Sequence, residues 1–171
     1  TEKYRPGSLR DVVGNNKYIK EVLQWGKDWP DVSHKSLIFY GEPGIGKTST
    51  ALALAADLSW DFIEVNASDQ RTAAVIDKLV GEASNTGTFF GTQGRRLVII
   101  DEADNIHGNY DRGGVKALSK IIKETSQPII LIANDFFRLN PTLKKLCKAY
   151  NFKGVRSPTI AKVLRGIAQK E

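Results

Sequence analysis

The sequence has few of the features that mark secreted, metal-binding or membrane proteins. Its single cysteine, Cys147, excludes an internal disulfide framework and offers no cysteine metal cluster. No apolar run approaches the roughly 18–20 residues that a membrane-spanning helix needs, and residues 1–6 lack the charged-then-apolar layout of a secretory signal. We therefore expect a chain with no membrane partner in a reducing, cytoplasmic compartment. Its 171 residues suit one domain with a real core.

Positive charge is concentrated in the last fifth of the chain. Residues 138–171 hold nine Lys or Arg and one acid, whereas residues 1–137 hold sixteen basic and eighteen acidic side chains. A basic segment beside a near-neutral body suits a polyanionic partner such as nucleic acid. A solvated helix face would have the same composition, so charge alone leaves both interpretations open.

Short apolar runs alternate with helical stretches. Their continuous apolar character is typical of strands buried on both faces, and the runs are 36–40, 61–65, 97–100, 129–133 and, more weakly, 150–155. Composition and helical spacing predict helices over residues 18–29, 48–58, 72–83 and 115–125. This alternation predicts an α/β fold with a doubly wound parallel five-stranded sheet and helices on both faces.

Residues 41–48 read Gly-Glu-Pro-Gly-Ile-Gly-Lys-Thr, which matches the Walker A phosphate-loop pattern in full. The loop follows a predicted strand and opens a predicted helix, where backbone N–H groups and the helix N-terminus attract phosphate. Lys47 would reach the β- and γ-phosphates of ATP, and the Thr48 hydroxyl would ligate Mg²⁺. The predicted nucleotide-binding residues of this loop are Gly41, Pro43, Gly44, Ile45, Gly46, Lys47, Thr48 and Ser49.

Acidic residues follow the predicted strand 97–100. Asp101 would hold Mg²⁺ as a Walker B acid does, and Glu102 is the candidate base that orients an attacking water. A pair of acids that cap a helix after a core strand is the simpler alternative. Asn134 follows the next predicted strand, so its amide would come to the same edge of the sheet and reach the γ-phosphate or the water.

These features resemble the AAA+ ATPases, which also have an inserted strand between the two Walker motifs (here 62–65) and a sensor 1 residue (here Asn134). Four short motifs narrow the resemblance to the clamp-loader subunits of replication factor C: Tyr4-Arg5-Pro6, Val12-Val13-Gly14, Asn66-Ala67-Ser68-Asp69 and Asp101-Glu102-Ala103-Asp104. Residues 24–29, 69–72 and 109–114 favour the large subunit of the archaeal complex.

The resemblance implies further roles. Tyr4, Arg5, Val12 and Val13 would line the adenine and ribose side of the pocket, and Asn66 would hold Glu102 away from water until DNA binds. It also implies an archaeal, nucleoid-associated protein. Residues 1–156 would form the Rossmann-like ATP-binding domain. Residues 157–171, with Ser157 as N-cap and Pro158 at N1, would start a truncated helical lid.

One position departs from the clamp-loader pattern. Small subunits carry a Ser-Arg-Cys motif whose arginine completes the neighbour's ATP site, and Leu146 stands at the arginine position here. A neutral side chain cannot stabilise a transferring phosphoryl group, so this subunit would receive an arginine finger without giving one. Lys144 or Lys145 as a substitute is the alternative, although lysine lacks the planar fork.

Partner surfaces are also implied by the resemblance. Phe89 and Phe90 would grip the sliding clamp (PCNA), unless both rings tuck under their loop. Primer–template DNA would be held without sequence preference by Arg71, Arg112, Gly113 and Lys116, although the two arginines would serve equally well in surface ion pairs. The small subunits of replication factor C would complete the assembly.

The sequence therefore predicts a P-loop ATPase that couples Mg·ATP binding to clamp opening and loading, with weak activity as an isolated domain. One alternative is a nucleotide-binding scaffold in which hydrolysis is incidental. Others are a different AAA+ loader of the origin-recognition or Holliday-junction type and, with least support, a small-molecule P-loop kinase.

Overall fold

The structure is a computed structural model that describes residues 4–67, 94–106 and 112–169. Its strands are β1 (Ser36–Tyr40), β2 (Asp61–Asn66), β3 (Arg96–Asp101), β4 (Ile129–Ala133) and β5 (Lys148–Asn151). Its helices are α1 (Asn16–Asp28), α2 (Lys47–Asp57), the short 3₁₀ helix η2 (Ala103–Asn105), α4 (Arg112–Glu124), α5 (Pro141–Leu146) and α6 (Ser157–Ala168).

The five strands form one sheet in the order β2-β3-β4-β1-β5, and every pair is parallel. Because the strands are parallel, their carboxyl ends lie at one edge. Tyr40 pairs in register with Ala133, and Asn66 with Asp101. The residues that follow β1, β3 and β4 therefore meet at this edge, where ligands bind in open α/β sheets.

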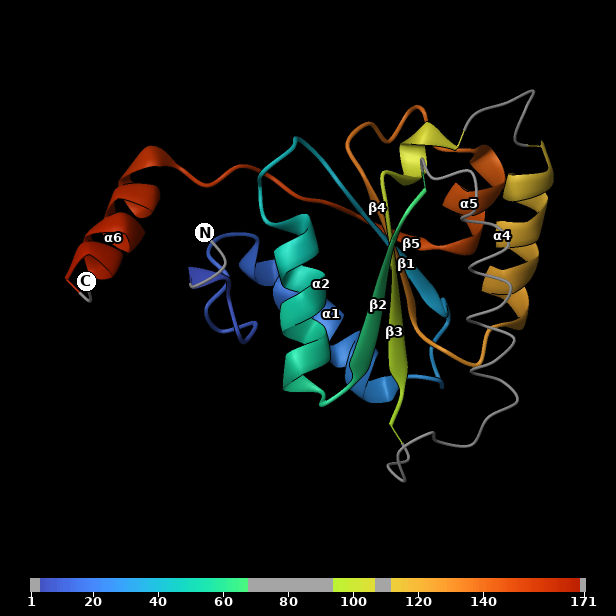
Figure 1. Cartoon of the computed structure of the whole chain (residues 1–171), viewed down its shortest axis with the longest axis horizontal. Helices are drawn as coiled ribbons and strands as arrows, with labels where there is room; N and C mark the ends of the chain where they lie inside the picture. The colour runs from blue at the N-terminus through green and yellow to red at the C-terminus, as the bar shows by residue number, and fades with distance from the viewer. Residues whose placement is uncertain (1–3, 68–93, 107–111, 170–171) are drawn as a thin grey trace.

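Helices cover both faces of the sheet, with α1 and α2 on one side and α4 and α5 on the other (Figure 1). Successive side chains of a strand pack into two separate hydrophobic cores, one on each face of the sheet. Leu37 and Phe39 of β1 pack in the core under α1 and α2, whereas Ile38 packs in the core under α4 and α5. This double burial explains the continuous apolar runs of β1, β3 and β4, whereas the edge strand β2 has no buried residue. The arrangement confirms the predicted α/β fold with a five-stranded parallel sheet.

Strand bounds match the predicted runs at β1 and β4, and β2 and β3 extend the predicted ranges by one or two residues. The prediction for the last strand was wrong: β5 spans Lys148–Asn151 rather than 150–155. It is an edge strand in which only Tyr150 is buried, so it has no continuous apolar run. The predicted helix 72–83 lies outside the described residues.

The predicted helices 18–29, 48–58 and 115–125 are present as α1, α2 and α4, which begin one to three residues earlier than predicted. Two further helix starts were missed or misplaced. Helix α5 was not predicted, although Asn140 caps it by accepting a hydrogen bond from the Thr142 N–H (2.9 Å) and Pro141 stands at its first position. The N-cap of α6 is Arg156 rather than Ser157, and Arg156 makes no side-chain cap. Ser157 therefore begins this helix instead of capping it.

Helix α6 stands apart from the sheet and its flanking helices, at the end of the extended segment that follows β5 (Figure 1). Ile160, Val163 and Leu164 are exposed on it. The boundary at residue 156 stays a prediction. Within the described ranges, none of the helices combines the length and apolar character needed to cross a membrane.

Candidate nucleotide-binding site

The loop between β1 and α2 places glycines in backbone conformations that strongly favour glycine, and Gly41 and Gly46 mark its two ends. Gly41 has φ +138°, and a Cβ there would run into the carbonyl oxygen of Phe152. Gly46 has φ +92° and is the N-cap of α2. These conformations are nearly free for glycine and costly for other residues. They let the chain turn sharply from the end of β1 into the N-terminus of α2.

A cavity of about 330 Å³ opens at this turn. It is lined by Pro43, Gly44, Gly46, Lys47, Thr48, Ser49, Asp101, Glu102, Ile132 and Asn134. The start of α2 faces it, so unpaired N–H groups and the positive end of the helix dipole favour an anion there. The structure thus brings the predicted phosphate-loop, acidic and amide residues to one place.

Lys47 is only 5% exposed, at the start of α2. Its ammonium donates to the carbonyl oxygens of Gly41 and Glu42 (2.7 Å each) and to Oδ1 of Asn134 (3.0 Å). Burial lowers the pKa of Lys47, and the negative charges of Asp101 and Asp104 oppose that shift. The cation is held at the point where β1, α2 and β4 meet.

Asp101 lies at the end of β3 beside the phosphate loop. Its Oδ2 accepts a hydrogen bond from the Thr48 hydroxyl (3.2 Å), and its Oδ1 accepts one from the Glu102 N–H (2.7 Å). A hydroxyl and a carboxylate are oxygen ligands of the kind that Mg²⁺ prefers. Among the described residues no group of three or more His, Cys, Asp or Glu side chains could hold a metal ion. The Thr48–Asp101 pair offers two such oxygen ligands at the mouth of the phosphate loop, which fits the predicted Mg²⁺ site.

Glu102 has a left-handed backbone (φ +53°, ψ +36°), which is uncommon for a residue with a side chain. Its Oε2 accepts a hydrogen bond from the Asn105 side chain (3.1 Å), and it lines the cavity next to Asp101. Strained backbone of this kind, costing about 1–3 kcal/mol, often occurs at functional sites. The geometry suits the predicted role of Glu102 as a base.

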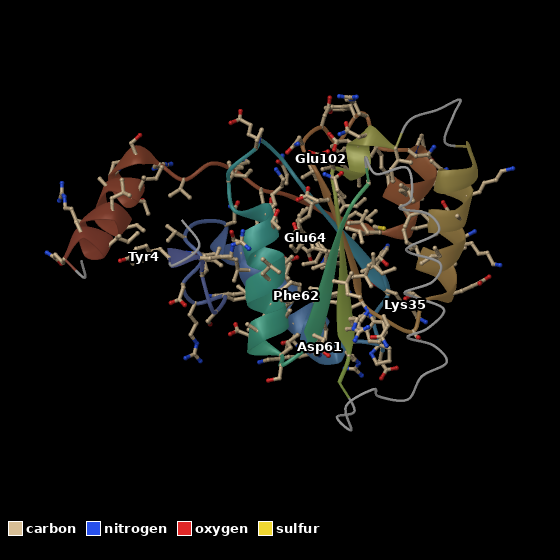
Figure 2. The ribbon with its side chains drawn as sticks, viewed as in Figure 1. Tyr4, Lys35, Asp61, Phe62, Glu64 and Glu102 are labelled. Carbon is tan, nitrogen blue, oxygen red and sulfur yellow. The ribbon has the colours of Figure 1, made fainter. Side chains whose placement is uncertain are left out.

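The residues predicted to bind the base of the nucleotide are not among those that line this cavity. Tyr4 is half-buried on the N-terminal segment, well separated from Glu102 in Figure 2. Val12 lines a different groove between the N-terminal segment and α1, and Val13 is half-buried and Arg5 exposed. Gly41 and Ile45, which were also predicted to bind the nucleotide, are not among the lining residues, and Ile45 packs against the core under α1 and α2. The base-side roles stay predictions.

The predicted partner residues are only partly described. Arg71, Phe89 and Phe90 lie outside the described residues. Arg112 and Gly113 begin α4, and Lys116 is exposed on the same helix. Leu146 at the end of α5 is half-buried and packs against the core under α4 and α5. Their functional roles stay predictions.

Sequence reasoning overlooked Ile132, which lines the cavity from β4, and Asp104, which lies behind it. Asp104 is 4% exposed, and its Oδ2 accepts hydrogen bonds from the N–H groups of Asn134 (3.2 Å) and Asp135 (2.9 Å). A third acid within four residues of Asp101 was the available signal, but the partners lie some thirty residues further along the chain. Only the fold shows the contact.

Comparisons with known proteins agree with this geometry. Residues 37–154 match the model of the family described as "ATPase family associated with various cellular activities (AAA)". The replication factor C large subunit of Methanocella arvoryzae is 52% identical over 171 residues, which are 100% of this chain and 31% of that protein. Those of Methanosarcina mazei and Methanothrix thermoacetophila are 51% and 50% identical over 99% of this chain, and the match covers 28% and 36% of their lengths.

The chain thus spans about a third of the length of these curated relatives. The match to the AAA model begins at the second residue of β1 and ends after β5, so it covers the candidate site and all of the sheet except Ser36. With its phosphate loop, acidic strand end and polar amide at one edge of a parallel sheet, the chain belongs to the AAA family of P-loop ATPases.

Proposed function

We propose that the chain is the ATP-binding and ATP-hydrolysing module of a sliding-clamp loader, in the position of the large subunit. The observation that carries this proposal is the convergence of Lys47, Asn134 and the Thr48–Asp101 pair on one cavity. The similarity over the full chain to three archaeal proteins, each named as a replication factor C large subunit, supports the choice of assembly.

Each residue of the cavity has a role in this proposal. The loop N–H groups and Lys47 bind the phosphates of ATP, and the Thr48 hydroxyl and Asp101 carboxylate hold Mg²⁺. Mg·ATP supplies the anhydride bond that is cleaved and a cation that neutralises its phosphates. Glu102 accepts a hydrogen bond from the attacking water and orients it, and the Asn134 amide contacts the γ-phosphate.

Calorimetric titration with Mg·ATP tests the core of the proposal. The chain is expected to bind Mg·ATP, and Lys47→Ala to weaken binding by about fivefold, because a phosphate oxygen gains the Lys47 ammonium only in exchange for one of its present acceptors. Glu102→Gln is expected to keep binding and to lower hydrolysis by about 100-fold or more, as loss of a general base does. Glu42→Gln is the matched control, since Glu42 is an exposed acid on the same loop whose backbone oxygen, not its side chain, meets Lys47.

Hydrolysis is measured with the chain alone and again with clamp, small subunits and primer–template DNA, because we propose that the isolated module turns over slowly. A folded chain that does not bind Mg·ATP would refute the proposal at its base. Binding with no hydrolysis under either condition would favour a nucleotide-binding scaffold.

Leu146 is the observation that favours the second candidate function, a nucleotide-binding scaffold in which hydrolysis is incidental. Its side chain is uncharged and half-buried against the core under α4 and α5, and a leucine offers no cation to a neighbouring ATP site. This is expected of a large subunit that receives an arginine finger from a neighbour and gives none. If Leu146→Arg stimulated hydrolysis by a neighbouring small subunit, that one-way arrangement would be contradicted.

The proposed clamp contact rests on Phe89 and Phe90. Binding of the chain to its sliding clamp is expected in calorimetry and is expected to be lost in the Phe89→Ala, Phe90→Ala double variant. Phe137→Ala is the control, since Phe137 is 90% exposed in the loop between β4 and α5 and has no proposed role in the clamp contact. Equal losses in both variants would indicate non-specific binding through exposed aromatic rings.

The proposed DNA contact rests on Arg71, Arg112, Gly113 and Lys116. Replacing Lys116 with Ala is expected to weaken binding to any primer–template sequence and to reduce its dependence on salt concentration. Lys27→Ala serves as control because Lys27 is equally exposed but lies on α1, on the opposite face of the sheet. A loss confined to some sequences would contradict contacts made through the phosphate backbone.

A further inference from the structure

Asp104 occupies an unusual position for a carboxylate. It lies in η2, just past the acidic end of β3, and is 4% exposed. Burial of a charged carboxylate is costly unless hydrogen bonds satisfy it. Here Oδ2 accepts from two consecutive backbone N–H groups, those of Asn134 at 3.2 Å and Asp135 at 2.9 Å. The side chain thus connects the end of β3 to the end of β4.

The two N–H groups belong to the point where β4 stops. The last strand residue is Ala133, and the chain then turns through Asn134 and Asp135, whose own Oδ1 accepts from the Phe137 N–H (2.8 Å). Sheet pairing no longer holds the backbone beyond Ala133. The carboxylate of Asp104 holds it instead, at the residue whose side chain faces the cavity.

The Asn134 side chain depends on that backbone. Its Oδ1 accepts from the Lys47 ammonium at 3.0 Å, and it is one of the groups that line the cavity. Side chains that must meet a ligand atom need to be held within roughly 0.5 Å, and second-layer hydrogen bonds usually do this. Asn134 itself is exposed, so core packing does not fix it.

We propose that Asp104 is a positioning residue that fixes the Asn134 backbone and thereby sets how well the site distinguishes ATP from ADP. This inference rests on the proposed function, in which the Asn134 amide contacts the γ-phosphate. The preference for ATP over ADP depends on where the acceptor oxygen of Asp104 lies. A negative charge at residue 104 with the acceptor in another place does not maintain that preference. A carboxylate that only stabilised the fold would affect ATP and ADP binding equally.

Two substitutions separate geometry from charge. Asp104→Asn keeps an oxygen acceptor at nearly the same place and removes the charge, whereas Asp104→Glu keeps the charge and moves the acceptor by one methylene. We expect Asp104→Asn to retain most of the preference for ATP over ADP. We expect Asp104→Glu to lose it, by about tenfold or more, as for a lost hydrogen bond to a charged group. Asp104→Ala, which removes the acceptor, is expected to behave like Asp104→Glu.

The measurement is the ratio of the dissociation constants for Mg·ADP and for a slowly hydrolysed Mg·ATP analogue, determined by calorimetry on each folded variant. Asn134→Ala is measured alone and combined with Asp104→Ala. If Asp104 acts through Asn134, the double variant loses no more preference than either single variant, because residues that act as one unit are not additive. Thermal unfolding identifies any variant that fails to fold, and Asp104→Glu and Asp104→Ala substitute for each other in that event.

The outcomes separate this inference from the function beneath it. A wild-type chain that binds neither nucleotide refutes the proposed function. If the wild type prefers ATP and Asn134→Ala lowers that preference, but Asp104→Ala and Asp104→Glu leave it unchanged, only the role of Asp104 is overturned. If Asn134→Ala leaves the preference for ATP unchanged, the role of Asp104 is overturned as well, because the Asn134 amide then makes no contribution that Asp104 could position. If Asp104→Asn loses the preference as fully as Asp104→Glu, charge rather than geometry is responsible, and the inference is wrong.

Discussion

Raising the pH is expected to destabilise the fold through Cys147. This residue follows the last turn of α5, is 4% exposed and packs in the core under α4 and α5. Burial raises the pKa of its thiol from 9.0 to about 12, because the apolar surroundings disfavour the thiolate. Unfolding exposes the thiol and lets it ionise at its ordinary pKa. Between pH 9 and 12 the folded chain therefore holds a proton that the unfolded chain releases, so stability falls as pH rises.

The size of the effect follows from the two pKa values. At pH 7 both forms keep the proton, and the difference is negligible. At pH 10 the unfolded thiol is largely ionised and the folded one is not, which lowers the free energy of unfolding by about 1.4 kcal/mol through this group alone. Other groups also titrate in this range, so the wild type must be compared with a variant that lacks only the thiol.

Urea unfolding at pH 7, 8, 9 and 10 under reducing conditions provides the comparison. Cys147→Ala is expected to be less stable than the wild type at pH 7 by about 1 kcal/mol, because a small buried group is removed. That gap should close and reverse by pH 10, since only the wild type carries the thiol. Two stability curves that stay parallel from pH 7 to pH 10 would refute the buried-thiol reasoning.

Three further predictions concern local structure and are measured by urea unfolding. Gly41→Ala should lower the free energy of unfolding by about 1–3 kcal/mol and weaken Mg·ATP binding, because the new Cβ meets the Phe152 carbonyl at a positive φ. An unchanged urea midpoint would contradict the tight turn at Gly41. Asn140→Ala should cost about 1 kcal/mol through loss of the α5 cap, and Asn140→Asp, which keeps an acceptor, should restore it. Glu21→Gln should change stability by less than about 1 kcal/mol, because its 3.2 Å ion pair with Lys148 is solvent-exposed; a larger loss would show that the pair acts with Tyr150.

The interior strands β1, β3 and β4 were predictable because both of their faces are buried, and the edge strand β2 was also predicted, although none of its residues is fully buried. β1 and β4 lie inside the sheet, so nearly all of their residues are apolar and the runs end where the strands end. β5 lies at an edge, where Lys148 and Ala149 are exposed and no continuous apolar run marks the start. Local composition carries information about burial, and β5, with only Tyr150 buried, is specified largely by its pairing with β1 instead.

The parts of the candidate site that follow from short sequence motifs could be predicted. The phosphate loop depends on spacing within eight residues, and the acids and the amide follow apolar strands, so their meeting at one edge could be inferred. The bonds from Asp104 to the Asn134 and Asp135 N–H groups depend on how η2 sits against the end of β4. No local pattern specifies that contact, so only the folded structure could show it.

The contacts of Lys47 bear on how tightly the site can hold a nucleotide. An ammonium has three N–H donors, and here three acceptors use them: two loop carbonyls and the Asn134 amide oxygen. A phosphate oxygen can therefore gain the cation only by displacing one of these acceptors, so binding exchanges one hydrogen bond for another. The net gain is the difference between a bond to an anion and a bond to a neutral oxygen, about 1 kcal/mol rather than the whole of a charged hydrogen bond. Because the Asn134 bond is the longest of the three, it is the one expected to be exchanged first, which would turn the amide toward the γ-phosphate as the cation leaves it.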